Sequence, residues 1–250
     1  MRPQPRMVIA SLLTGLALIG AALTGYWAWL GYFGGELYVP VRARKAPSPA
    51  HAGLAAVILS GDMGFKTGMG REIGDRLAAE GIPVLGVNSL VYFRERRSPV
   101  EVRALVGDAI RRGLAFGHAR RLLLIGQSYG ADMVHVGLAD LSPDLRSKIA
   151  LVALVVPTRT VMYRASPAEM LDLVPPDAAA IDTGRRLDWV PLLCIHGREE
   201  KDSLCPLLRQ SNVRDVAMPG GHPLRRDADG LFRHLMESVD ALPAAELPAG

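Results

Sequence analysis

The pentapeptide GQSYG at 126–130 places Ser128 between two glycines. It follows an apolar run at 121–126 and precedes a helical pattern at 129–141. This is the strand, turn and helix context of a nucleophile elbow, in which small flanking residues permit the strained turn that exposes a serine hydroxyl. The alternative is a serine that only caps the helix. We take Ser128 as a candidate nucleophile.

A serine hydroxyl is a weak nucleophile at neutral pH, so this hypothesis requires a histidine base and an orienting acid later in the chain. His222 lies in the glycine-rich loop MPGGHPL, after the last predicted strand and before the final helix, where a base is expected. Four other histidines fall within predicted helices or precede strands: His51, His118, His135 and His234. We predict His222 as the base.

The acid is expected in the loop REEKDSLCP, which follows the predicted strand at 190–197. Asp202 is the favoured residue, with Glu199 and Glu200 as alternatives, because any of the three could orient the imidazole and stabilise its charged form. The residues that are not the acid would be ordinary loop charges. The expected triad is therefore Ser128, Asp202 and His222.

An oxyanion hole would combine the backbone N–H of Tyr129 with one from the loop SGDMGF, near Asp62 or Met63. This loop continues as GDMGFKTG, in which the glycines and lysine lack the spacing of a phosphate-binding loop. We therefore do not expect a nucleotide site.

The two cysteines, Cys194 and Cys205, are expected to form a disulfide in an exported protein and to close the loop that carries Asp202. Two buried free thiols are the alternative. No paired metal-binding motif is present, so we expect neither a metal nor another cofactor.

The elements that would position these residues alternate along the chain. Short apolar runs predict strands at 54–60, 82–88, 121–126, 149–157, 190–197 and 213–220. Amphipathic stretches predict helices at 68–80, 99–116, 129–141 and 226–240. Continuous apolar strands indicate a sheet that is covered on both faces, so we predict a doubly wound, mostly parallel α/β fold with its site at the carboxyl ends of the strands.

The N-terminal segment 1–37 is uncharged from Met7 to Gly35, which is long enough for a transmembrane helix. Five aromatic residues resemble an interfacial belt at its end: Tyr26, Trp27, Trp29, Tyr32 and Phe33. A cleaved signal peptide, with small residues at 20–22, is the alternative. Both readings predict export. We expect a proline-containing linker at 38–53 and a catalytic domain at 54–250.

Basic residues flank the predicted span on both sides, so charge alone does not decide its orientation. The chain carries a formal net charge of +4. Its arginines are dispersed and its aromatic residues do not interleave with them, which excludes a typical nucleic-acid-binding surface. A mildly basic surface suits anionic lipid headgroups better.

The motifs LSGDMGF, VNSLVYF, GQSYGADM, GREEKDSLCP and MPGGH occur in this order, and together they resemble the VirJ/AcvB bacterial virulence protein family from about Leu54 onwards. The resemblance implies an α/β-hydrolase fold, with Ser128, Asp202 and His222 as its triad. It also implies export to the periplasm and an association with type IV secretion proteins. With an uncleaved N-terminal helix we expect a single-pass inner-membrane protein whose catalytic domain lies in the periplasm, and with a cleaved signal peptide a soluble periplasmic protein.

The resemblance further implies hydrolysis of aminoacyl-phosphatidylglycerol, notably its lysyl form. Candidates to hold the cationic aminoacyl group are Asp62, Asp132, Glu199 and Glu200, although each could equally be an ordinary surface or helix-start charge. The alternatives are a general carboxylesterase or lipase, and a non-catalytic scaffold with a hydrolase fold.

Overall fold

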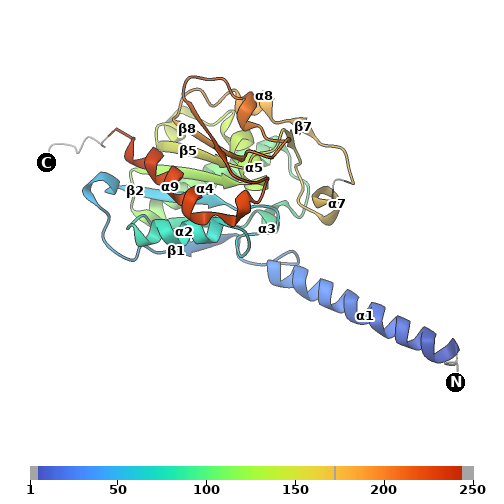
Figure 1. Cartoon of the computed structure of the whole chain (residues 1–250). Helices are drawn as coiled ribbons and strands as arrows, with labels where there is room; N and C mark the ends of the chain where they lie inside the picture. The colour runs from blue at the N-terminus through green and yellow to red at the C-terminus, as the bar shows by residue number, and fades with distance from the viewer. Residues whose placement is uncertain (1–4, 172, 244–250) are drawn as a thin grey trace.

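The computed structural model describes residues 5–171 and 173–243 and contains a seven-stranded sheet with an N-terminal helix that projects from it (Figure 1). The strand order is β1-β3-β2-β4-β5-β8-β9. All neighbouring strands are parallel except β1, which runs antiparallel to β3. The strands are β1 (Tyr38–Val41), β2 (Leu54–Leu59), β3 (Val84–Val87), β4 (Arg121–Gln127), β5 (Ile149–Val155), β8 (Leu192–Gly197) and β9 (Val213–Met218). The predicted doubly wound, mostly parallel sheet is confirmed.

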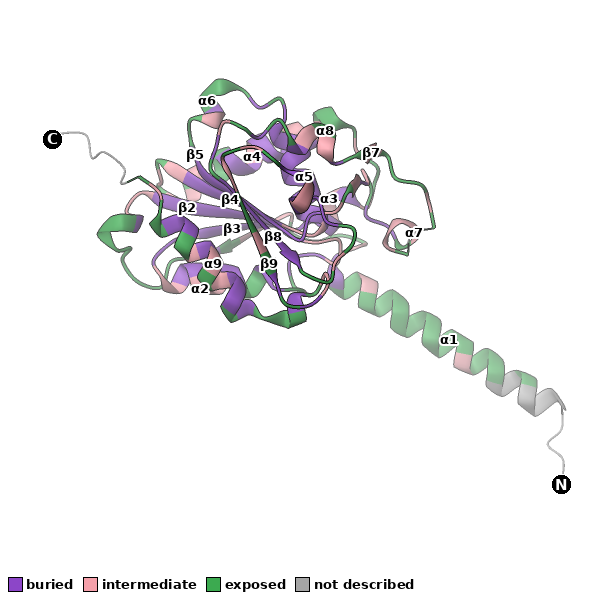
Figure 2. Cartoon of the chain, turned by 45° about the horizontal axis from the view of Figure 1, so that its top comes forward, coloured by how far each residue is buried: buried purple, intermediate pink, exposed green. Residues whose placement is uncertain are grey.

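Helices cover both faces of the sheet, as Figures 1 and 2 show. The long helices are α1 (Pro5–Leu30), α2 (Gly70–Ala79), α4 (Pro99–Gly117), α5 (Tyr129–Leu138) and α9 (Ala228–Asp240). Short elements connect them: η1 (Pro49–His51), α3 (Ser89–Phe93), α6 (Pro143–Arg146), β6 (Thr160–Val161), α7 (Pro167–Met170), β7 (Ala178–Ala179), α8 (Ile181–Gly184), η2 (Cys205–Leu207) and η3 (Leu224–Arg226). The four predicted helices correspond to α2, α4, α5 and α9.

The apolar strands separate two cores, because successive side chains of a strand point to opposite faces of the sheet. In β2, Val57 and Leu59 pack into the core beneath α4 and α5. Ile58, between them, packs into the core beneath α2 and α9. Every residue of β2 and β5 is buried. This burial on both faces explains why these strands lack an alternating polar pattern.

The expected linker at 38–53 is wrong for its first four residues. Tyr38–Val41 forms strand β1 at the edge of the sheet, with Tyr38 opposite Val87 and Val41 opposite Val84. The Tyr38 hydroxyl also donates a hydrogen bond of 2.7 Å to Asp108. Pro40 obscured this strand in the sequence, but a proline is tolerated at an edge, where one side of the strand needs no partner.

Helix α1 includes a 19-residue segment, Leu12–Leu30, that is long and apolar enough to cross a membrane. A signal sequence near an N-terminus has the same properties. The large apolar side chains described along this helix are mostly exposed: Ile9, Leu12, Leu13, Leu16, Leu18, Ile19 and Leu23. The described residues therefore include one helix that could span a membrane. Residues 1–4, which include one of the basic residues before the predicted span, lie outside the described residues.

The predicted disulfide between Cys194 and Cys205 is present. Cys194 lies in β8 and Cys205 begins η2, and both side chains are fully buried. The bond closes the loop that follows β8, which carries the three candidate acids. It therefore restrains the position of those acids relative to the sheet.

Reduction of this disulfide is expected to lower the free energy of unfolding by about 3 kcal/mol, because the bond closes a loop with a sequence separation of 11 residues. Urea titrations of the detergent-solubilised protein, with and without reductant, measure the difference. The Cys194→Ala/Cys205→Ala double variant is the control and should not respond to reductant. Two thiols that alkylate freely under non-reducing, denaturing conditions would show that the bond does not form.

Candidate active site

Ser128 occupies a strained turn between β4 and α5, with φ of 52° and ψ of −124°. The neighbouring glycines are required sterically. A Cβ atom at Gly126 would lie 2.5 Å from the Cα of Ala131, and one at Gly130 would lie 2.3 Å from the carbonyl oxygen of Leu59. The Ser128 side chain makes no capping hydrogen bond to α5. The geometry is that of a nucleophile elbow and not of a capping serine.

A chain of two hydrogen bonds links the serine to a carboxylate. Ser128 Oγ lies 2.8 Å from His222 Nε2, and His222 Nδ1 lies 2.5 Å from Glu200 Oε1. The three side chains come from the ends of β4, β8 and β9, which lie far apart in the sequence. Glu200 also accepts a hydrogen bond of 3.3 Å from the backbone N–H of Gly197. This fixes the carboxylate against the end of β8.

The structure corrects the predicted acid, because Glu200 and not Asp202 contacts His222. The chain turns directly after β8, where Glu200 N–H donates to the Gly197 carbonyl at 3.0 Å, and this turn carries the Glu200 side chain beneath the imidazole. Asp202 lies two residues further on, exposed, at the wall of a cavity. Glu199 is also exposed and accepts a hydrogen bond of 3.2 Å from Arg225.

Gly197 lets the acid loop and the histidine loop approach each other. A Cβ atom at this position would lie 2.3 Å from the Gly221 carbonyl oxygen, directly before His222. The backbone N–H of Glu199 reaches the Gly220 carbonyl at 3.0 Å. The two loops therefore hold Glu200 and His222 together through their backbones as well as through their side chains.

The pKa of His222 is raised above its ordinary value, primarily by the hydrogen bond from its ring to Glu200. Burial opposes the rise, whereas the negative charges of Glu200, Asp132 and Asp62 add to it. A histidine in this environment is a stronger base, and its protonated form is stabilised. Both properties suit a group that accepts the serine proton and later returns it.

The expected oxyanion loop, which follows β2, lies against the serine. A Cβ atom at Gly61 would be 3.6 Å from the Ser128 Cβ. Ser89 holds this loop in place, because its hydroxyl donates to the Ser60 carbonyl at 2.6 Å and its backbone N–H donates to Ser60 Oγ at 3.0 Å. The Tyr129 N–H group belongs to the first residue of α5, at the positive end of that helix.

Asp62 has a carboxylate next to these expected donors. Burial raises the pKa of the Asp62 carboxyl, while hydrogen bonds from the backbone N–H groups of Met63 and of Asp62 itself, together with the charge of His222, oppose the rise. The Asp62 carboxyl therefore lies close to the backbone of the loop in which an oxyanion donor is expected.

Two cavities meet at Ser128 and His222. The first, which we call the acidic cavity, has a volume of about 340 Å³ and is lined by Asp62, Asp132, Glu169 and Asp202, with Arg164 as its only arginine among the described residues. The second, which we call the helix-side cavity, has a volume of about 510 Å³. Its lining includes Tyr26, Met63, Met69, Glu72, Pro223 and Arg226.

The predicted substrate-binding carboxylates therefore separate. Asp62 lines both cavities. Asp132 borders the acidic cavity, but its two oxygens accept hydrogen bonds of 2.9 Å from the backbone N–H and the hydroxyl of Thr158. Glu200 is held by His222. Glu199 lines neither cavity.

Sequence reasoning missed Glu169, which belongs to the short helix α7 and lines the acidic cavity. The only local signal was the pattern Ser166-Pro167 with Glu169 three residues after the serine, which is typical of a helix start and not of a binding site. No group of three or more His, Cys, Asp or Glu residues in the described part of the chain could hold a metal ion.

A family described as "Bacterial virulence protein (VirJ)" matches residues 53–242. The chain belongs to this family. The match begins just before β2 and covers the elbow, the acid loop and the histidine loop. No curated protein matched the sequence.

Solved structures establish the fold of this VirJ family member. BlEst2, a lipase from Bacillus licheniformis in its mature form, aligns with a TM-score of 0.59 at 10% identity, over 81% of this chain and 97% of that one. Est1E from Butyrivibrio proteoclasticus, with ferulic acid bound, aligns with a TM-score of 0.56 at 11% identity, over 81% and 94%. The esterase domain of a Rhodothermus marinus protein aligns with a TM-score of 0.52 at 17% identity, over 82% and 98%. The fold is that of the α/β-hydrolases.

The assignment of the acid predicts different effects for two neighbouring carboxylates. Glu200→Gln is expected to reduce kcat for ester hydrolysis on the order of 10³-fold, because the imidazolium loses its charged partner. The pH–rate profile of the residual activity should also change. The Glu200 hydrogen bond raises the pKa of His222, so its removal should move the acidic limb of the profile to lower pH.

Asp202→Asn is the matched comparison, and it should leave the position of the acidic limb unchanged. Steady-state kinetics on a soluble ester between about pH 5 and pH 9 test both variants around the ordinary pKa of histidine. A large kcat loss in Asp202→Asn with near-normal activity in Glu200→Gln would reverse the assignment.

Proposed function

We propose that this VirJ family member is a membrane-tethered serine hydrolase that cleaves the aminoacyl ester of aminoacyl-phosphatidylglycerol. The observation that carries the proposal is the hydrogen-bonded series Ser128, His222 and Glu200 at a strained elbow. A hydroxyl, a base and an orienting acid in this order are the components of acyl transfer through a covalent intermediate.

In the first half of the reaction, Ser128 Oγ attacks the carbonyl carbon of the aminoacyl ester while His222 Nε2 accepts the serine proton. Glu200 stabilises the resulting imidazolium from the other side of the ring. The carbonyl oxygen becomes negatively charged and is stabilised by the Tyr129 N–H and by an N–H of the loop at Asp62 and Met63. When the ester bond breaks, the glycerol oxygen takes the proton from His222 and phosphatidylglycerol leaves.

In the second half, water attacks the aminoacyl group on Ser128 while His222 accepts one of its protons. The tetrahedral intermediate then releases the free amino acid, and Ser128 recovers its proton from the imidazolium. No metal or cofactor is needed for either step, because the serine and histidine carry the full exchange of protons and acyl group.

The acidic cavity suits the acyl half of such a substrate. Asp132 is already bonded to Thr158, but the three other carboxylate residues of this cavity still outnumber its single arginine. An aminoacyl group carries at least one ammonium. The Tyr129 hydroxyl is buried in the described structure without a hydrogen-bond partner, and it belongs to a residue that lines this cavity. Burial and the neighbouring carboxylates raise the pKa of Tyr129, so the phenol stays neutral in this acidic environment.

The apolar helix α1 accounts for access to a membrane lipid. A periplasmic domain held on an inner-membrane helix would meet its substrate at the outer leaflet of that membrane, without extracting it into water. Family membership and the proximity of α1 to the site support this placement. Type IV secretion proteins remain proposed partners.

The experiment uses the full-length protein in vesicles that contain lysyl-phosphatidylglycerol, and it measures released lysine by mass spectrometry. The wild type is expected to release lysine, and Ser128→Ala, which removes the attacking oxygen and little volume, should lose several powers of ten in rate. Circular dichroism of both proteins should be the same, since residue 128 makes no structural side-chain bond other than to His222 in the described residues.

The same preparation is assayed on a short acyl ester that carries no amino group. Rapid turnover of that ester without release of lysine would identify a general esterase or lipase. Turnover of neither compound would favour a non-catalytic scaffold. A Ser128→Ala variant as active as the wild type would remove the serine from the mechanism.

A further inference from the structure

The end of α1 is packed onto the hydrolase domain. Leu30 is fully buried within the core that also contains residues of α3 and α5, and Trp27 and Tyr32 pack against the same core. Two cations fasten the segment: Lys66 Nζ donates to the Trp29 carbonyl at 2.8 Å, and Arg94 donates to the Tyr32 carbonyl at 3.3 Å. Residues 27–32, which we call the base of α1, are therefore fixed to the domain. The helix does not leave the domain from a flexible linker.

This base lies against the expected oxyanion loop. Gly64 adopts φ of +80°, and a Cβ atom there would lie 3.2 Å from the Leu30 carbonyl oxygen and 2.8 Å from Asn88 Oδ1. Figure 1 shows α1 leaving the domain on the side of α3 and α7, opposite the C-terminus. Helices α3 and α7 lie beyond the carboxyl ends of the strands. Helix α1 therefore starts at the same end of the sheet as Ser128.

Helix α1 also contributes one residue to the lining of the helix-side cavity. Tyr26 lines this cavity together with Ser128 and His222. Tyr26 is 44% exposed, and Trp29 and Phe33, which are 53% and 63% exposed, continue an aromatic surface near the same end of the helix. Tyr26 therefore belongs both to the lining of the cavity that contains Ser128 and, through its stacked contact with Trp29, to the exposed aromatic surface of α1.

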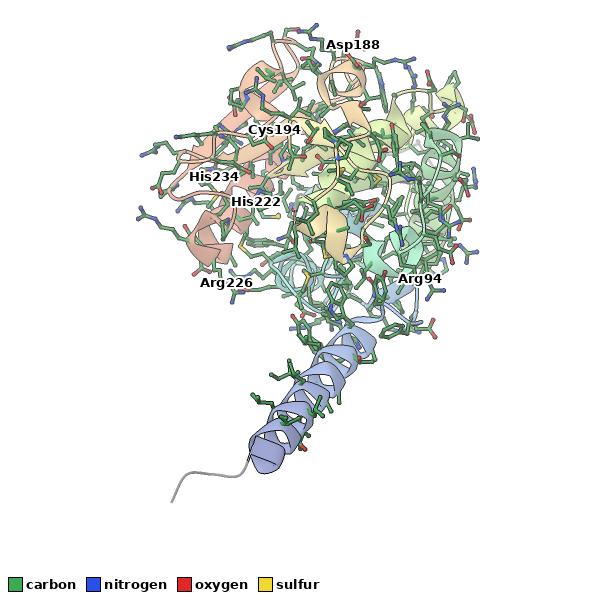
Figure 3. All side chains as sticks on the ribbon, turned by 90° about the vertical axis from the view of Figure 1, so that its right-hand side faces the viewer. Arg94, Asp188, Cys194, His222, Arg226 and His234 are labelled. Carbon is green, nitrogen blue, oxygen red and sulfur yellow. A yellow bond between two sulfur atoms is a disulfide. The ribbon has the colours of Figure 1, made fainter. Side chains whose placement is uncertain are left out.

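The helix-side cavity carries a cation that has no acidic partner. No carboxylate among residues 5–171 and 173–243 forms an ion pair with Arg226, whereas the adjacent Arg225 pairs with Glu199. Two carboxylate residues, Glu72 and Asp62, also line this cavity, and Glu72 is bonded to Arg76 at 2.8 Å. Figure 3 looks onto this side of the domain and labels His222 and Arg226 above the base of α1.

We infer that the helix-side cavity is the subsite for the alcohol half of the ester, a phosphatidylglycerol. Arg226 binds its phosphodiester, because a guanidinium presents paired N–H donors that match two phosphate oxygens. The acyl chains pass Tyr26 and follow α1 into the leaflet. This inference rests on the proposed function, and it fixes the direction of the substrate, with its cationic aminoacyl group in the acidic cavity and its anionic phosphate on the opposite side of Ser128.

The test is a binding measurement, so that it does not depend on turnover. Full-length Ser128→Ala protein in a neutral detergent is titrated with short-chain phosphatidylglycerol by isothermal calorimetry. Adding Arg226→Gln should weaken binding about tenfold, as expected for the loss of a charge-assisted phosphate contact. Arg233→Gln, on the exposed face of α9 away from both cavities, is the matched control and should not change the affinity.

Two further titrations separate the lipid from its phosphate. Glycerol 3-phosphate should bind more weakly than phosphatidylglycerol and should depend on Arg226 in the same way. Tyr26→Ala should weaken binding of phosphatidylglycerol and leave binding of glycerol 3-phosphate unchanged. Equal affinities for phosphatidylglycerol and glycerol 3-phosphate would contradict the proposal that the acyl chains follow α1.

Absence of phosphatidylglycerol binding, or equal affinity with Arg226 and with Gln at this position, would overturn the subsite. Kinetics distinguish this failure from failure of the proposed function. In the Ser128-containing enzyme, Arg226→Gln should raise KM for lysyl-phosphatidylglycerol by a much larger factor than KM for lysine methyl ester, which lacks a phosphate. An enzyme that binds phosphatidylglycerol through Arg226 but releases no lysine would contradict the proposed reaction and retain the lipid subsite.

Discussion

Close backbone contact between the segments that follow the carboxyl ends of the strands determines the geometry of the site. At Gly130 the first turn of α5 presses against the carbonyl oxygens of Leu59 and Ser60, and at Gly197 the end of β8 presses against the loop before His222. Side chains larger than hydrogen would separate these segments. Their contact aligns the serine, the histidine and Glu200 within hydrogen-bond distance, although the three residues come from different strands. The strain at Ser128 persists because the surrounding sheet and helices over-determine its conformation.

The same contacts explain which parts of the site could be predicted from the sequence. The elbow was predictable because its glycines, strand and helix are contiguous in the sequence. His222 was predictable because its loop follows the last strand and therefore lies at the carboxyl ends of the strands, as Ser128 does. The acid was not, since Glu199, Glu200 and Asp202 share one irregular loop and only the turn after β8 decides which carboxylate meets the imidazole. Glu169 lies in the long region between β5 and β8, where the chain has only short elements and no periodic pattern to place a side chain.

The fold was predictable to a similar degree. Runs of Val, Ile and Leu identified the parallel strands β2, β3, β4, β5 and β8, because these strands are buried and leave little alternation to misread. Strand β9 is mostly exposed or half-buried and has a less continuous apolar run. Strand β1 was missed because it is short, antiparallel and contains Pro40. The base of α1 was also beyond prediction. Its aromatic residues are typical of a membrane interface, but only the folded structure separates Trp27 and Tyr32, which pack on the domain, from Tyr26, Trp29 and Phe33, which are exposed or border the active site.

The site thus has two sides that meet at one serine. The acidic cavity has the larger number of carboxylates, whereas the helix-side cavity contains Arg226 and Tyr26 of the apolar helix α1, together with Glu72 and the shared Asp62. The central claim is that Ser128 carries the aminoacyl group during hydrolysis, and rapid-quench mass spectrometry of the full-length protein mixed with lysyl-phosphatidylglycerol vesicles tests it most directly. The account predicts a transient lysyl ester on the peptide that contains Ser128, which forms before free lysine accumulates and decays as the lipid is consumed. The account would be contradicted if lysine were released at the normal rate while that peptide stayed unmodified at every quench time and the lysyl group appeared on another residue.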